Sequence, residues 1–457
     1  MAAMKSSGRV RASIAVIASA IAVAALVALY QARHAARESG TVVIPSRVDG
    51  TASAAARSAP ATQADTAALP APVVDASVVA CERKLQSLGI DEHSEQVGMG
   101  AFEREARYVE DRAVASMLAS TDPRTSAAAD FWLALQADLA SLVRAGCEPD
   151  DEACGRHATE TRARGEGAAE RLVRKAMRTG DPVVYGWAFQ VCRQAAADAP
   201  SCQLVSAAQW ARLSPGNAFA WFAAAEEASA RKNTAALDAA MFQIASADRV
   251  DSATFVLPGL LADHSIGDGS DALVAAALAV SAIYMSAAND FRVSTPSTYC
   301  NGAALMDANR RQICEKTAEL FVSRSDTLLV RGVGVGLGKR LGWPEARLRA
   351  LQDERDALNM VSGDFSDVIS DVIVGSACRT AVSVLRRIPA SASLGELGAL
   401  RQRRVASGKT VDELAAAWHE RLRRMSAAPA AERAASAASA ASVAASASAQ
   451  AASSPNR

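Results

Sequence analysis

A stretch without any charged side chain, residues 12–30, constrains this chain more than any other feature of its sequence. As an α-helix these nineteen residues would be about 28 Å long, close to the ~30 Å hydrocarbon core of a bilayer. Lys5, Arg9 and Arg11 precede the stretch, and Tyr30 ends it at a position suited to the membrane interface. We therefore predict one membrane-spanning anchor over residues 12–30.

Two other interpretations of this stretch fit the sequence less well. A soluble core helix is disfavoured because globular helices of this length normally keep a polar face. A cleaved signal peptide is the stronger alternative, but the apolar run is longer than a usual signal core. Tyr30, Arg33 and His34 also stand where small residues would mark a cleavage site. The sequence favours an uncleaved signal anchor.

The charges beside the anchor indicate its orientation only weakly. Three basic side chains lie before it, whereas Arg33 and Arg37 follow it closely. Basic residues accumulate on the cytoplasmic side, so residues 1–11 are expected in the cytoplasm. The chain beyond the anchor would then lie outside the cytoplasm.

All eight cysteines lie after the anchor, which makes their state informative about the compartment. Eight cysteines allow about a hundred pairings, so connectivity does not follow from the sequence alone. Their grouping suggests Cys147 with Cys154, Cys192 with Cys202, Cys300 with Cys314, and Cys81 with Cys378. The last pair would tie the start of the folded region to its end. Disulfides persist only in an oxidising compartment.

Buried, reduced thiols are the alternative for these cysteines, since free cysteine is a common small core residue. A metal site is not indicated, because there is no C-x2-C pair and the histidines lack ligand spacing. Those histidines are His34, His93, His157, His264 and His419. We predict disulfides and no metal or cofactor. The predicted location is the bacterial inner membrane, as a single-pass protein with most of the chain in the periplasm.

The composition favours an all-α fold. Hydrophobic residues make up 50% of the chain but aromatic residues only 5%, and the excess is alanine. Alanine is the strongest helix former and buries little apolar area, which suggests closely spaced helices rather than a sheet sandwich. The formal net charge is zero, so electrostatics give no reason to expect nucleic acid as a partner.

The chain divides into a linker, a helical domain and a tail. Residues 31–77 are rich in small residues and proline, and are expected to form a disordered linker. Residues 426–457 are a low-complexity Ala/Ser tail, also expected to be disordered. Helical patterns dominate residues 78–425. They cover 101–118, 127–145, 167–178, 223–230, 234–247, 271–288, 302–323, 345–358, 364–387 and 411–424.

Three aromatic residues recur at one interval in the middle of this domain. Trp187, Trp221 and Phe255 are spaced 34 and 34 residues apart. Around Trp221 the sequence gives a helix stop, the turn 213–217, a first helix, a break at 232–233 and a second helix. This segment, about residues 182–261 within the stretch 182–266, resembles the tetratricopeptide repeat family.

The resemblance implies helical hairpins stacked into one continuous core, because a single pair cannot cover its own apolar face. Three features depart from the family pattern. Ala225 stands where glycine is usual, Phe242 and Ala245 match the second helix only with a one-residue slip, and Arg249 stands where proline closes the repeat. An irregular helical array in which the aromatic spacing is accidental remains the alternative.

Two motifs suggest a binding site at first sight, but the sequence supports neither. The glycines of the run 331–340 could present N–H groups to a phosphate, but the run matches neither phosphate-binding pattern. Close helix packing or a flexible bend is the favoured interpretation. Asp364, Asp367 and Asp371 share a helical face that could hold a cation, but a solvated first helical turn explains them better.

No residue is therefore predicted to be catalytic or to bind a cofactor or metal. The expected partners are the membrane, through one span, and a protein of unknown identity. The sequence favours a non-catalytic helical module or scaffold for protein interactions, anchored in the membrane and facing the periplasm. The alternative is an envelope enzyme whose site is assembled from residues distant in sequence.

Overall fold

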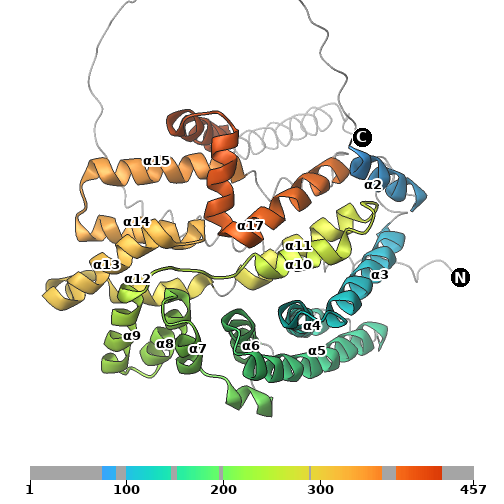
Figure 1. The fold of residues 1–457 in the computed structure, drawn as a ribbon, viewed down its shortest axis with the longest axis horizontal. Coiled ribbons are helices and arrows are strands. Elements are labelled where there is room, and N and C mark those ends of the chain that lie inside the picture. Colours follow the sequence, from blue (N-terminus) through green and yellow to red (C-terminus); the bar gives the residue numbers. More distant parts are fainter. Residues whose placement is uncertain are drawn as a thin grey trace, which may run out of the picture.

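The structure, a computed structural model, describes residues 75–88, 99–145, 152–194, 199–287, 290–362 and 377–424 (Figure 1). Within these ranges every regular element is helical, and β-type pairing is limited to two isolated bridges. The all-α prediction is confirmed. The predicted anchor over 12–30 and the tail over 426–457 lie outside the described residues, as does nearly all of the linker. Of the helices that are described, none combines the length and apolar character needed to cross a bilayer.

Helices follow one another through each of the described ranges. In chain order they are α2 (Ala76–Ser87), α3 (Met99–Leu118), α4 (Pro123–Ala145), α5 (Glu152–Thr179), α6 (Pro182–Gln194), η1 (Pro200–Leu204), α7 (Ala207–Leu213), α8 (Ala218–Ala230), α9 (Thr234–Ser246), α10 (Val256–Ser265), α11 (Ala272–Ala287), η2 (Asp290–Val293), α12 (Ser294–Tyr299), η3 (Gly302–Met306), α13 (Ala308–Arg324), α14 (Leu328–Leu341), α15 (Glu345–Ser362), α17 (Ala377–Ala406) and a last helix over 411–424. Figure 1 shows α10 and α11 near the middle, with α3–α6 on one side and α13–α15 on the other.

Local capping signals start several of these helices. Asp122 accepts a hydrogen bond from the Thr125 N–H at 2.9 Å, and Pro123 is the first residue of α4. At the last helix, the Thr410 N–H donates to the Glu413 carboxylate at 2.8 Å, and the Glu413 N–H donates to Thr410 Oγ1 at 3.2 Å. This reciprocal pair is a capping box.

Several helices differ from the sequence-based expectation, among them α5, which begins at Glu152 and not at residue 167. The run 302–323 is split into η3 and α13 because the Asp307 side chain accepts from the Arg310 N–H at 2.9 Å and starts a new helix. The run ending at Arg387 continues through Pro389 as α17, which reaches Ala406 with a break at Gly395.

The core is continuous across most of the fold. Its largest cluster joins α3–α9 to α13 and α14, and a second cluster joins α2, α11 and α17. Aromatic rings run from α7 to α13: Trp210 contacts Phe219, Phe219 contacts Phe222, and Phe222 contacts Phe321, with ring centroids 6.1, 5.5 and 5.5 Å apart. These few aromatic residues therefore supply large buried areas between alanine-rich helices.

The three aromatic residues of the 34-residue spacing lie on three different helices. Trp187, in α6, is buried and stacks on Phe131 with ring centroids 5.3 Å apart. Trp221 is half-buried in α8, and Phe255 is buried at the start of α10. Helices α8 and α9 form the expected hairpin, but α9 packs on α13, whereas α10 packs on α11, α3 and α17.

Three disulfides join parts of the fold. Cys81–Cys378 connects α2 to α17, Cys192–Cys202 connects α6 to η1, and Cys300–Cys314 connects the end of α12 to α13. These are three of the pairs that the sequence grouping suggests. Cys147 lies outside the described residues, and the side chain of Cys154 is not described.

The glycine-rich run belongs to α14 and allows close packing, as the sequence predicts. A Cβ atom on Gly334 would lie 2.7 Å from Phe321 Cβ of α13, and one on Gly338 would collide with the ring of Trp343. Asp364, Asp367 and Asp371 lie outside the described residues.

Candidate binding site

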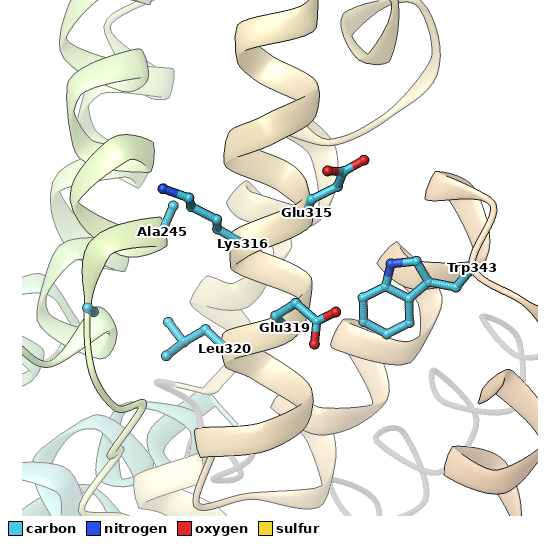
Figure 2. A pocket seen from close by; sticks show the side chains of 7 residues that line it. Ala245, Glu315, Lys316, Glu319, Leu320 and Trp343 are labelled. Carbon is cyan, nitrogen blue, oxygen red and sulfur yellow. The ribbon is translucent and has the colours of Figure 1, made fainter.

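A hollow of about 410 Å³ lies on the surface over α13 (Figure 2). The end of α9 borders it with Ala245 and Ala247, and Trp343, between α14 and α15, borders the opposite side. Figure 2 shows Lys316 extending toward Ala245, and Glu319 between α13 and Trp343. The hollow thus combines small and aromatic apolar surface with acidic and basic side chains.

Helix α13 presents charged residues to the hollow because its apolar residues face inward. The buried positions recur at spacings of three and four residues, and are Cys314, Thr317, Ala318 and Phe321. This periodicity turns Glu315, Lys316 and Glu319 to the outer face. Leu320, which is buried, forms apolar surface at the base of the hollow.

The extended segment after α9 fixes that helix against α13. The Asp248 N–H donates to the Gly216 carbonyl at 3.0 Å, on the α8 side. The Val250 N–H donates to the Arg324 carbonyl at 3.0 Å, and Val250 in turn accepts from the Asp326 N–H at 3.0 Å. The segment therefore joins the turn before α8 to the end of α13 through main-chain bonds, independent of side-chain identity.

Trp343 is held on the other side of the hollow by two contacts. Its N–H donates to the Gly338 carbonyl at 3.0 Å, and its ring lies 3.7 Å from the Arg347 guanidinium carbon. Arg347 donates two hydrogen bonds to Glu319, both at 2.6 Å. These bonds lower the pKa of Glu319, because they favour its charged form.

One charge in the hollow is left without a partner. Glu319 pairs with Arg347, and Glu315 accepts from Arg311 at 3.2 Å. Lys316 is exposed and makes no ion pair or hydrogen bond with any described residue. The hollow therefore offers a free ammonium group beside apolar surface.

An exposed aromatic residue lies on α9 one turn before the hollow, although it does not line it. This residue, Phe242, is 55% exposed. It lies three residues before Ala245, so both residues lie on the same face of α9. We refer to the hollow together with Phe242 as the α9–α13 groove.

The sequence did not identify this site. Its predicted site residues were the eight cysteines and Trp187, Trp221 and Phe255, and none of them lines the hollow. The groove depends on residues that are distant in the chain.

Two polar pairs with catalytic residue types lie elsewhere. His419 Nε2 is 2.8 Å from Asp356 Oδ2, and Ser116 Oγ is 2.9 Å from His264 Nδ1. Neither histidine lines the hollow. Within the residues that the structure describes, no group of three or more metal-ligating side chains converges.

No family model matches this chain, and neither a curated protein nor a solved structure gives a match.

Proposed function

We propose that the protein is a membrane-tethered helical module that binds a protein partner in the periplasm through the α9–α13 groove. The observation that carries this proposal is Lys316, which has no partner among the described residues and lines the hollow together with Ala245 and Trp343. A protein interface of this kind combines an apolar centre with a few polar groups that fix orientation.

The tether and the location rest on the sequence and on the disulfides. The apolar stretch 12–30 is long enough to span a bilayer. Three cysteine pairs at bonding distance support folding in an oxidising space, since cytosolic thiols are kept reduced. The linker over 31–77 would then give the domain reach from the membrane surface.

The charges of the groove indicate the chemistry of the partner. Glu315 and Glu319 are already neutralised by arginines of this chain, whereas Lys316 is not. A partner segment with a carboxylate beside a bulky apolar side chain would pair with Lys316 and cover Leu320 and Phe242. Such a pair gives specificity and a faster encounter in addition to affinity.

A degenerate tetratricopeptide-like segment over 182–261 is part of this proposal. The helical hairpin of α8 and α9 and the 34-residue aromatic spacing support it. In this arrangement the second helix of the hairpin, α9, supplies one wall of the groove.

We expect Lys316→Glu to weaken partner binding about tenfold, which corresponds to ~1.4 kcal/mol, because attraction becomes repulsion at a surface site. The full-length chain would carry a photoreactive phenylalanine analogue at position 242 and be irradiated in intact cells. The measurement is the yield of one discrete protein adduct on position 242.

The matched control is Lys409→Glu, a charge reversal at an exposed lysine outside the groove, which should leave the adduct unchanged. A second control places the analogue at position 306, since Met306 is 88% exposed and does not line the hollow. An adduct that appears equally at both positions, or that survives Lys316→Glu undiminished, contradicts the proposal.

A further inference from the structure

A reciprocal pair of hydrogen bonds joins the turn between α13 and α14 to the break in α17. The Leu397 N–H donates to the Asp326 carbonyl at 2.9 Å, and the Leu328 N–H donates to the Glu396 carboxylate at 2.8 Å. Each segment thus supplies one donor and one acceptor to the other. We call this contact the Asp326–Glu396 joint.

The backbone at the joint is held in an unusual conformation. Gly395 has φ 70°, a value that L-residues other than glycine rarely adopt. A Cβ atom there would lie 2.8 Å from Asp326 Cβ, so the two segments approach closely only because position 395 is glycine. The joint is therefore a specific close contact where α17 changes direction.

The Asp326 carboxyl is poorly solvated for a charged group. One oxygen, Oδ2, accepts from the Ser252 N–H at 2.9 Å and from its hydroxyl at 2.8 Å. The other, Oδ1, is closed off from solvent and has no hydrogen-bond partner among the described residues. Asp326 forms no ion pair with any of them, so an ionised carboxylate would be left without a cation.

The charged groups around the joint are mostly acidic. Asp251, on the segment before α10, faces Asp326 and adds repulsion. On α17, burial raises the pKa of Glu396, whereas the Leu328 N–H and the charge of Arg403 lower it. Arg403 and Arg387 both donate to the Ser362 carbonyl, at 3.3 and 3.4 Å.

Burial and the charge of Asp251 together raise the pKa of Asp326 to about 7. Because the folded pKa lies above the ordinary value of 3.8, the contribution of Asp326 to stability is fully present below about pH 4. It is lost as the pH rises through about 7. The stability that is lost is that of the closed joint, because Asp326 is buried only there.

We propose that the Asp326–Glu396 joint is a proton-dependent clamp, which holds the second half of α17 on the α13–α14 turn while Asp326 is protonated and loosens when that proton is lost. The first half of α17 is fixed to α2 by Cys81–Cys378. The second half packs on α15 through Leu397, Leu400 and Leu358. The opening that we propose is that of residues 396–406, the part of α17 after the break at Gly395.

Hydrogen exchange of the Leu397 and Leu328 amides measures the clamp directly, since these N–H groups make its two bonds. The exchange rates are measured in the full chain and corrected for the intrinsic chemical rate, which gives the opening constant of each amide. This opening constant should rise by up to about tenfold per pH unit between about pH 4 and 7, and should level off above pH 7. A pH-independent opening constant at both amides overturns the proposal.

Three variants separate the carboxyl from general effects of pH. Asp326→Asn should remove the rise between about pH 4 and 7. Asp251→Asn should move the rise to lower pH, because it removes the repulsion, while Asp248→Asn, at an exposed aspartate paired with Arg249, should not. If Asp326→Asn does not fold, Asp251→Asn decides, and an unshifted rise in that variant rejects the clamp.

Discussion

Replacing both Cys81 and Cys378 by serine should lower the free energy of unfolding by about 5 kcal/mol, near the top of the range for a single disulfide. The bond joins residues 297 apart in sequence, so it restricts nearly the whole folded region in the unfolded state. Denaturant unfolding of the fragment 75–424, followed by circular dichroism, measures this change.

The double variant Cys300→Ser and Cys314→Ser is the matched control, since both cysteines are fully buried and their bond spans only 14 residues. The chain-entropy argument gives about 3 kcal/mol for a loop of that size. If the short-range variant were destabilised as much as the long-range one, chain closure would not be the role of Cys81–Cys378.

Gly334→Ala should destabilise the domain by about 1–3 kcal/mol, because the added methyl group has no space between α13 and α14. Its Cβ atom would lie 2.7 Å from Phe321 Cβ and 3.0 Å from the Val322 nitrogen. Neither atom can move without shifting the helix that carries it. Thermal unfolding, compared at matched protein concentration, measures the effect.

Gly336→Ala tests the same chemical change two residues further along α14. Nothing lies within 4 Å of a Cβ atom at Gly336, so this variant should gain up to about 1 kcal/mol from the helix propensity of alanine. Equal effects of the two substitutions would mean that the run is not packed as a helix against α13.

The parts of the fold that the sequence predicted correctly depend on local interactions. Asp122 and the Thr410–Glu413 pair cap helices through bonds that reach three residues, so their spacing reveals them. The alternation of buried and exposed positions in α13 is likewise a property of one segment. For this reason the all-α class was predicted, whereas the predicted helix starts at 167 and 302 were wrong, since α5 begins at Glu152 and α13 at Ala308.

The path of α17 was not predicted because tertiary contacts override local preference there. Pro389 usually ends a helix, yet it is exposed, and the helix continues past it because Leu385 and Ile388 are buried in the cluster that α17 forms with α11. The change of direction occurs instead at Gly395, where close approach to Asp326 requires glycine. No local sequence pattern indicates that Gly395 and Asp326 lie close together.

The groove could not be predicted for a similar reason. Ala245, Lys316 and Trp343 belong to separate helices or connections, and they meet only because the extended segment after α9 pairs with the end of α13. A lone exposed lysine or a half-buried tryptophan is common in helical sequences. Only their proximity in space indicates a candidate site, and that proximity is seen only in the tertiary structure.

Whether the folded domain lies in an oxidising compartment at a membrane is tested most directly by mapping the cysteines of native protein without reduction. Membranes would be alkylated at once, digested, and analysed by mass spectrometry. We expect an intact chain that keeps residues 12–30, with Cys81 bonded to Cys378, Cys192 to Cys202 and Cys300 to Cys314. Free thiols at these six positions, or recovery of the chain in the soluble cytoplasmic fraction, would contradict a membrane-tethered periplasmic binding module.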